Sequence, residues 1–437
     1  MGSRETALNV LLACRIGDGW SNGVLKDYVA RDRLDSRDSA LAARLCYGVI
    51  QNRNYLDFYL QQLLTGKVKT LHPVLRDILH LGLYQIYLMD KIPESAAVNE
   101  SVELAKKYCR KQSNASGLVN GVLRNAVRTK GNLKEPISWE DKYSHPGELI
   151  NLLKSYVGKE RIEPMLRANN AIAPMVVQVN TLRIDGNELK SKLEAEGVCA
   201  QPHPWLTDCL VLSGTGNLEQ LISFQEGLFY VQDAAAKLSV LCAQLSPGQN
   251  VLDCCAAPGG KSFAAAIAME GQGSIVSCDV HEHKIDLLAK GAARLGLANI
   301  TAKSQDATEF CPEWEDQMDT VIADVPCSGF GIIRKKPDIR YKDLAAMAEL
   351  PVLQEKILNN VAGYVKPGGM LLYSTCTLVQ AENEGMVDKF LHTHPNFTTE
   401  PLPLGAPFPK NESGMITLVP GEYDTDGFFI CRLRRIV

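Results

Sequence analysis

The sequence predicts a doubly wound α/β domain with a mostly parallel sheet, preceded by an all-α domain and a small α+β module. From Gly227 onward, short apolar stretches such as NVLD and SIVSCD alternate with helical stretches of ten or more residues, which is the pattern of a parallel sheet. Before about residue 127, apolar residues recur at helical spacing with short connections. A chain of 437 residues suits two or three domains, and we place them at 1–140, 147–225 and 226–437.

Composition and charge restrict the class of protein. The 13 cysteines are odd in number and scattered, which favours reduced thiols and a cytoplasmic location. No apolar run reaches the roughly 18 residues of a membrane helix, so no membrane association is expected. Residues 1–145 carry a net charge of +6 and the remainder −10, which favours contact of the front segment with a polyanion.

The first domain is predicted to be helical from about Thr6 to Val127. Three apolar stripes support this, and the third enters through Pro73, a residue suited to the first turn of a helix. The stripes are Leu8, Leu11 and Leu12; Leu41, Leu45, Val49 and Ile50; and Leu75, Ile78, Leu79, Leu83, Ile86 and Tyr87. The segments YGVIQNRNYLD, IPESAAVNESVELAKKY and GLVNGVLRNAVR resemble the NusB-type RNA-binding domain. An ordinary helical dimerisation domain is the alternative.

Residues 147–225 alternate between helical and strand patterns, as expected of a small α+β module. Two helical stretches precede the strand PMVVQVNTLR, and the helix GNELKSKLEAEG and the strand CLVLSG follow it. Asn180 and Arg183 stand at the end of the first strand. They are candidates for contact with phosphate or sugar, and a plain surface turn is the equal alternative.

Marked residues follow successive strands of the third domain, where ligands bind in doubly wound sheets. The stretch VLDC leads into a loop with two glycines that allow a ligand close to the backbone. Asp279 and Asp306 follow the next two strands, and Asp324 ends the one after. Each acid alone is more often a helix cap, but together they suit a ribose and an adenine without a phosphate cradle, as in S-adenosylmethionine. The loop residues are Cys255, Ala256, Ala257, Pro258, Gly259, Gly260 and Lys261.

Two neighbouring strands each deliver a thiol to the same edge. Cys327 lies in the loop of Val321–Gly331, VIADVPCSGFG, and Cys376 follows the strand MLLYST. Methylation of cytosine at C5 requires a thiolate that adds to C6, a carboxyl near N3 and an acceptor for the C5 proton. Asp324 and the two thiols supply these groups, while the residues alone leave open which thiol is the nucleophile. A buried structural cysteine is the alternative for Cys327.

CAAPGGK at 255–261, DVPCSG at 324–329 and STCT at 374–377 resemble the motifs of RNA cytosine-5 methyltransferases, and the whole chain resembles the RsmB (Sun/Fmu) family that modifies bacterial 16S rRNA. The resemblance implies a Rossmann-like domain, with Cys376 as nucleophile and Cys327 as the group that assists release. It places Asp324 at the base and Lys261 among the catalytic residues. It also implies S-adenosylmethionine contacts from 255–261, Asp279, Asp306 and Asp324. We expect a cytoplasmic monomer without a metal site.

A basic run, RKKPDIRYK, follows the loop of Cys327. We expect Arg334, Lys335, Lys336 and Arg340 to contact the RNA backbone, with a solvated charged face as the alternative. The competing functions are a non-catalytic, antitermination-type RNA-binding protein, a methyltransferase for another RNA such as tRNA, and a small-molecule methyltransferase. The intact set of Asp324 and two cysteines argues against the first. The front domain and the basic run argue against the last.

Overall fold

The computed structural model describes residues 2–16 and 21–436, and its contacts divide the chain into two units. One unit comprises Met1–Lys154 together with Lys335–Lys342, and the other comprises Ser155–Arg334 and Asp343–Val437. Within the described part of the chain, no helix is both long and apolar enough to cross a membrane.

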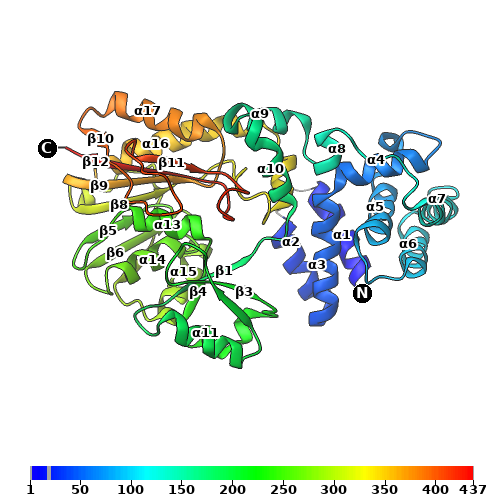
Figure 1. Cartoon of the computed structure of the whole chain (residues 1–437), viewed down its shortest axis with the longest axis horizontal. Coiled ribbons are helices and arrows are strands. Elements are labelled where there is room, and N and C mark those ends of the chain that lie inside the picture. The colour runs from blue at the N-terminus through cyan, green and yellow to red at the C-terminus, as the bar shows by residue number, and fades with distance from the viewer. Residues whose placement is uncertain (1, 17–20, 437) are drawn as a thin grey trace. The chain divides into compact units, whose positions relative to one another are not determined.

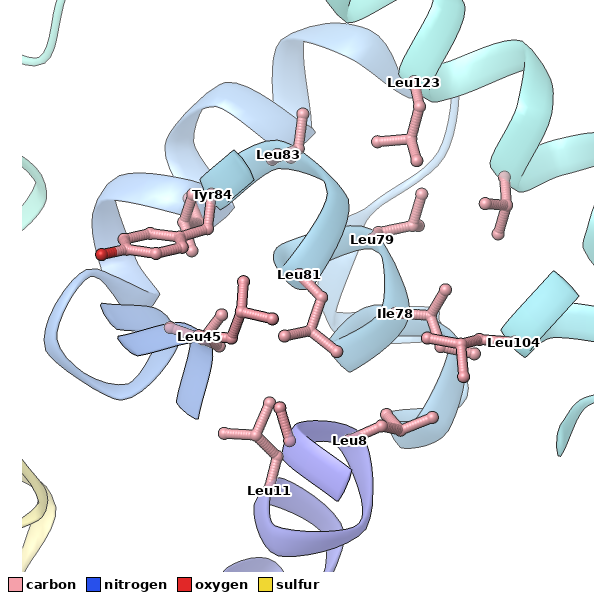
Figure 2. Close-up of a cluster of buried hydrophobic side chains, with 14 of the residues drawn as sticks. Leu8, Leu11, Leu45, Ile78, Leu79, Leu81, Leu83, Tyr84, Leu104 and Leu123 are labelled. Atoms are coloured by element: carbon pink, nitrogen blue, oxygen red, sulfur yellow. The ribbon is translucent and has the colours of Figure 1, made fainter. Parts of the chain in front are cut away.

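The first unit is helical, as the apolar spacing predicts. Apolar side chains of α1, α3, α5, α6 and α7 converge on one core (Figure 2). Helix α5 is the centre of this core because it is buried on all sides rather than along one stripe. The helices are α1 (Ser3–Ile16), α2 (Ser21–Asp32), α3 (Ser36–Gln51), α4 (Arg53–Leu63), α5 (Pro73–Leu88), α6 (Glu94–Tyr108), α7 (Ala115–Thr129) and α8 (Trp139–Tyr143), and η1 (Val68–Thr70) is a short 3-10 turn.

A segment from far along the sequence completes this helical unit. The 3-10 turn η4 (Pro337–Tyr341) packs against α3 and buries Ile339. Asp338 accepts a hydrogen bond from the backbone N of Ser21 (3.1 Å), and the guanidinium of Arg53 lies over the ring of Tyr341 at 4.5 Å. The helical unit is therefore not assembled from the front of the chain alone.

Arg340 is the anchor of this segment. Only 1% of the residue is exposed, and its Nη1 donates to the carbonyls of Gln51 (2.8 Å) and Ser144 (3.0 Å). Its Nε donates to the carbonyl of Pro337 (3.1 Å), and burial lowers the pKa of the guanidinium to about 10. The predicted contact between Arg340 and RNA is therefore wrong, because its donors are directed into the protein.

The second unit begins with a small antiparallel sheet. Its strand order is β2-β3-β1-β4, and helices α11 and α12 accompany it. The elements are α9 (Gly147–Val157), which contains the boundary between the units, α10 (Lys159–Asn170), β1 (Met175–Val179), α11 (Gly186–Ala195), β2 (Cys199–Pro202), β3 (Cys209–Ser213), η2 (Leu218–Gln220), α12 (Ile222–Gln225) and β4 (Phe229–Val231). Because β4 pairs with β1, the small sheet continues past residue 225, where the sequence analysis ends the module.

The main sheet confirms the predicted doubly wound, mostly parallel fold. Its order is β10-β12-β9-β8-β5-β6-β7, with β11 paired to β12. Strands β5 to β9 pair in parallel, whereas β12 is antiparallel to β9, β10 and β11. The strands are β5 (Asn250–Asp253), β6 (Ser274–Asp279), β7 (Ile300–Ser304), β8 (Met318–Asp324), β9 (Val365–Thr375), β10 (Phe397–Thr399), β11 (Met415–Leu418) and β12 (Phe428–Arg435).

Helices cover both faces of this sheet. Helices α13, α14 and α15 lie on one face, and α16 and α17 lie on the other (Figure 1). Chain order reverses between β5 and β8, so the crevice beyond the carboxyl ends of these two strands is the expected ligand site of the fold. The helices are α13 (Ala234–Cys242), α14 (Gly260–Ala268), α15 (Glu282–Leu295), α16 (Leu350–Ala362) and α17 (Glu384–Thr393), and the 3-10 turns are η3 (Pro312–Trp314), η5 (Ala346–Glu349) and η6 (Gln380–Glu382).

Replacement of Arg340 tests its role as an anchor. We expect Arg340→Met to lower the free energy of unfolding of the helical unit by about 1–3 kcal/mol, because buried carbonyl groups lose their donor. Urea unfolding of the full chain measures this. The matched control is Arg128→Met on the exposed side of α7, for which we expect a change within about 0.5 kcal/mol. Equal effects of the two substitutions would contradict the anchoring role.

Candidate active site

The loop between β5 and α14 contains the predicted segment 255–261 and forms a tight turn at the crevice. The backbone N of Ala256 donates to the carbonyl of Cys278 at the end of β6 (2.7 Å), and the N of Gly259 donates to the carbonyl of Ala256 (2.7 Å). Gly259 has φ +109, and a Cβ there would lie 2.5 Å from the ring of Phe263. Glycine is required at this position on both grounds.

Asp253, the last residue of β5, holds this turn in place and is a residue that the sequence analysis missed. It is fully buried, and its Oδ2 accepts a hydrogen bond from Oγ of Ser262 (2.7 Å). Ser277 of β6 donates in turn to Ser262 (2.7 Å), so the chain of contacts ties β5, α14 and β6 together. Burial raises the pKa of Asp253 to about 7, against the opposing effect of the Lys261 charge and with the help of the Asp324 charge.

Asp279 and Asp306 lie where the sequence predicts them, at the carboxyl ends of the neighbouring parallel strands β6 and β7. Asp279 is 9% exposed, and its Oδ1 accepts from the backbone N of His281 (3.0 Å), with Nζ of Lys284 at 3.7 Å. Oδ1 of Asp306 accepts from the backbone N (2.8 Å) and Oγ1 (2.7 Å) of Thr308. In each carboxylate, the same single oxygen therefore makes these local turn contacts.

Asp324 ends β8 and forms a close ion pair with Lys261. Nζ of Lys261 lies 2.5 Å from Oδ2 of Asp324, and Oγ of Ser374 donates to Oδ1 (2.7 Å). Lys261 comes from the start of α14 and Ser374 from β9, so three elements meet at this carboxylate. Ser374 is the partner that the sequence analysis did not identify as such.

The two cysteines meet at the same edge. Strands β8 and β9 pair in parallel with Asp324 opposite Ser374, which sets the loops of Cys327 and Cys376 side by side. The Sγ atoms lie 3.2 Å apart, and both residues are half-buried. The hydrogen bond to Cys376, together with burial and nearby negative charge, raises the pKa of Cys327 well above its usual value. At this distance a hydrogen bond joins the two thiols, and either sulfur can be its donor.

Gly331 closes the loop of Cys327 against the loop of Cys376. Its backbone N donates to the carbonyl of Cys376 (2.9 Å), and its carbonyl accepts from the N of Gly427 (2.8 Å). A Cβ at Gly331 would lie 2.0 Å from the carbonyl oxygen of Gly427. Glycine at this position therefore allows the backbone segments of Gly331, Cys376 and Gly427 to approach one another closely.

Two further residues predicted to contact RNA have buried side chains. Only 4% of the Arg334 side chain is exposed, and it pairs with Asp424 (3.1 Å) and Asp426 (3.9 Å). Asn180 is fully buried, and its Nδ2 donates to the carbonyls of Gly227 and Leu295 (2.9 Å each). The RNA contacts predicted for Arg334 and Asn180 are therefore wrong, for the same reason as that of Arg340.

The other three predicted RNA contacts stay predictions. Arg183, Lys335 and Lys336 lie on the surface. Arg183 also donates to the backbone carbonyl of Glu226. The surface position of these cations is compatible with phosphate contact and does not test it.

Comparison with known proteins gives matches along the whole chain. Residues 1–128 match the model of the NusB family, 145–219 match a ferredoxin-like domain of RsmF/B-like methyltransferases, and 240–434 match 16S rRNA methyltransferase RsmB/F. These matches follow the order of domains expected from the sequence.

Similar proteins that match this chain over most of its length are known from bacteria. The chain is 34% identical over 444 residues to a Bacillus subtilis protein named probable ribosomal RNA small subunit methyltransferase B, covering 99% of this chain and 98% of that one. It is 35% identical to ribosomal RNA small subunit methyltransferase B of Vibrio cholerae, covering 93% and 92%. The crystal structure of PH0851 is similar over 99% of this chain and 98% of that chain, with 26% identity and a TM-score of 0.82.

The raised pKa of Asp253 predicts a pH-dependent stability. Between about pH 4 and 7 the folded state holds a proton that the unfolded state releases, so this stabilising contribution is complete below about pH 4 and is lost as the pH rises to about 7. We expect Asp253→Asn, which mimics the protonated group, to gain stability relative to the wild type across this range, on the order of 1 kcal/mol per pH unit.

Denaturant unfolding at a series of pH values measures the difference between the two proteins. The matched control is Asp286→Asn on the exposed face of α15, which removes a carboxylate that is not buried. A difference for Asp253→Asn that stays constant from pH 4 to 7 would contradict the assignment.

Proposed function

Because the chain belongs to the RsmB/F family of 16S rRNA methyltransferases, we propose that it methylates C5 of a cytosine in 16S rRNA through a covalent intermediate on Cys376. The observation that carries this proposal is the approach of two thiols to 3.2 Å beside Asp324 at the carboxyl edge of the sheet. Membership in the family establishes a methyltransferase that acts on rRNA. The position on the base, the donor and the covalent step are the proposal.

The residues of the crevice fit S-adenosylmethionine as the methyl donor. Asp279 at the end of β6 suits the two hydroxyls of a ribose, and Asp306 at the end of β7 suits an adenine amino group. The turn at Gly259, whose φ of +109 favours glycine, allows the backbone a close approach to a ligand. When bound, this cofactor supplies an electrophilic methyl group on a sulfonium.

The ion pair of Lys261 and Asp324 lies between this crevice and the thiols. Lys261 lies at the start of α14 and Asp324 at the end of β8, beside Ser374. We assign Asp324 to the contact with the base at N3, where its carboxylate accepts a hydrogen bond from the N3–H that forms, with a proton from solvent, as the thiolate adds at C6. Lys261 holds this carboxylate in place and balances its charge.

Cys376 is the nucleophile in this proposal. Its Sγ forms a bond to C6 of cytosine, which makes C5 nucleophilic enough to accept the methyl group. In this assignment Cys327, whose pKa is raised, keeps its proton and donates the hydrogen bond that joins the two sulfur atoms.

Cys327 then assists elimination. Formation of the C6–S bond turns Cys376 into a thioether, and this removes the largest cause of the raised pKa of Cys327. The Cys327 thiol is then able to lose its proton to solvent and to accept the proton from C5 of the methylated base. As this C–H bond breaks, its electron pair forms the C5–C6 double bond, and the C6–S pair returns to Cys376.

The direct test is methyl transfer to rRNA. We expect the full-length protein, supplied with labelled S-adenosylmethionine and undermodified 16S rRNA, to produce 5-methylcytidine after digestion to nucleosides. Transfer RNA in parallel separates rRNA from another RNA as the substrate. Label in another nucleoside, or the absence of transfer to either RNA, would contradict the proposal.

Substitution of each thiol tests the assignment of roles. We expect Cys376→Ser to abolish both methylation and covalent protein–RNA adducts, because no thiolate adds to C6. We expect Cys327→Ser to accumulate an adduct, because addition proceeds and elimination stalls. Denaturing gels with labelled RNA measure the adduct, and Cys311→Ser, which lies outside the pair, is the control. The reverse pattern would exchange the roles of Cys327 and Cys376.

A further inference from the structure

A buried carboxylate lies directly behind the two thiols. Glu382, the last residue of η6, is 2% exposed. Its Oε2 accepts a hydrogen bond from the backbone N of Ser328 (2.9 Å), and its Oε1 accepts one from Oγ of the same serine (2.6 Å). Since Ser328 follows Cys327 directly, this carboxylate fixes the chain on one side of that thiol.

Gln354 of α16 fixes the other side. Its Nε2 donates both to Oε2 of Glu382 (2.9 Å) and to the backbone carbonyl of Pro326 (2.9 Å). Pro326 precedes Cys327, so the residues before and after the thiol are tied to the same carboxylate, one of them through a carboxamide.

The same polar cluster reaches the loop of Cys376. Oγ of Ser328 is 2.6 Å from Oγ1 of Thr377, the residue after Cys376. Asn383, the neighbour of Glu382, donates through Nδ2 to the carbonyl of Thr377 (3.1 Å), and its Oδ1 accepts from Oγ1 of Thr375 (2.6 Å). Glu382 and Asn383, together with Gln354, therefore hold the chain on both sides of each thiol.

The carboxylate of Glu382 lies among uncharged hydrogen-bond donors and close enough to Cys327 to affect that thiol. Its three hydrogen-bond donors are a peptide N–H, a hydroxyl and a carboxamide, none of which is charged. Burial of a carboxylate against neutral donors alone is costly, because no cation offsets the loss of hydration. Its negative charge contributes to the raised pKa of Cys327, after the hydrogen bond with Cys376, burial and the charge of Cys376.

We propose that Glu382 is a positioning residue that holds Cys327 against Cys376 and thereby sets the rate of elimination. This inference rests on the cysteine mechanism of the proposed function. Glu382 acts through Cys327 and does not touch the substrate. A misplacement of about 1 Å at a reacting group lowers a rate on the order of 100-fold, so a clamp of this kind has a measurable effect.

Glu382→Gln in the full-length protein is the primary test. The carboxamide side chain has nearly the volume of the carboxylate. It removes the negative charge of Glu382, and its NH₂ group faces hydrogen-bond donors that the carboxylate oxygens accept from. We expect turnover of RNA to fall on the order of 100-fold, with the KM for RNA unchanged and with accumulation of the covalent adduct that Cys327→Ser shows. Glu355→Gln, which removes a surface partner of Lys389 on the same helix as Gln354, is the matched control and should turn over like the wild type.

A double-mutant cycle separates positioning from general stability. If Glu382 acts through Cys327, the double variant Glu382→Gln/Cys327→Ser is no slower than Cys327→Ser alone. If the two losses multiply, Glu382 has a role independent of Cys327 and the inference is overturned. An adduct level in Glu382→Gln equal to that of the wild type would also overturn it.

Melting temperature and S-adenosylmethionine binding are measured for each variant. Should Glu382→Gln fail to fold, Ser328→Ala removes one hydroxyl from the cluster, and adduct accumulation there supports the clamp while a wild-type level overturns it. Absence of 5-methylcytidine with the wild type overturns the proposed function and the clamp together. Methylation by the wild type and adduct trapping by Cys327→Ser, without trapping by Glu382→Gln, overturn the clamp alone.

Discussion

The parallel pairing of β8 with β9 is the constraint on which the site depends. Asp324 lies opposite Ser374 in this register, and each strand ends within a few residues of a cysteine. A shift of one residue would exchange the faces on which these side chains lie, and the thiols would no longer meet. The hydrogen bond from Ser374 to Asp324 reinforces the same register, so the contact that orients the carboxylate also aligns the two cysteines.

The proposed mechanism gives the two thiols unequal roles although they are the same residue type. The hydrogen bond between them, over 3.2 Å, is the largest cause of the raised pKa of Cys327. The inequality lasts only while Cys376 is free, because a sulfur bound to carbon no longer holds the proton of its neighbour. Reaction of the first thiol would thus prepare the second. In the proposed mechanism, this sequence of events orders addition before elimination.

Two arginines for which the sequence suggests nucleic acid contacts instead bind groups of the protein itself. Arg334 is neutralised by two aspartates within its own unit, and Arg340 binds backbone carbonyls in the helical unit. Within the segment that follows the loop of Cys327, Ile339 and Arg340 therefore belong to the interior of the helical unit, whereas Lys335 and Lys336 lie on the surface. Arginine is suited to this task because its planar guanidinium offers several donors to carbonyls that would otherwise be buried without partners.

The sequence by itself determined the fold class, the succession of a helical, an α+β and a doubly wound region, and the residues at the strand ends. Asp279, Asp306, Asp324, Cys327 and Cys376 were found because each follows an apolar strand, and parallel strands bring their carboxyl ends to one edge. Only the tertiary structure showed that Arg340 and Asn180 are buried. It also decided the pairing of β4 with β1 and the contacts of Asp253 and Glu382. The physical reason is that burial depends on which element packs over a residue. A local pattern of charge or apolarity does not contain that information.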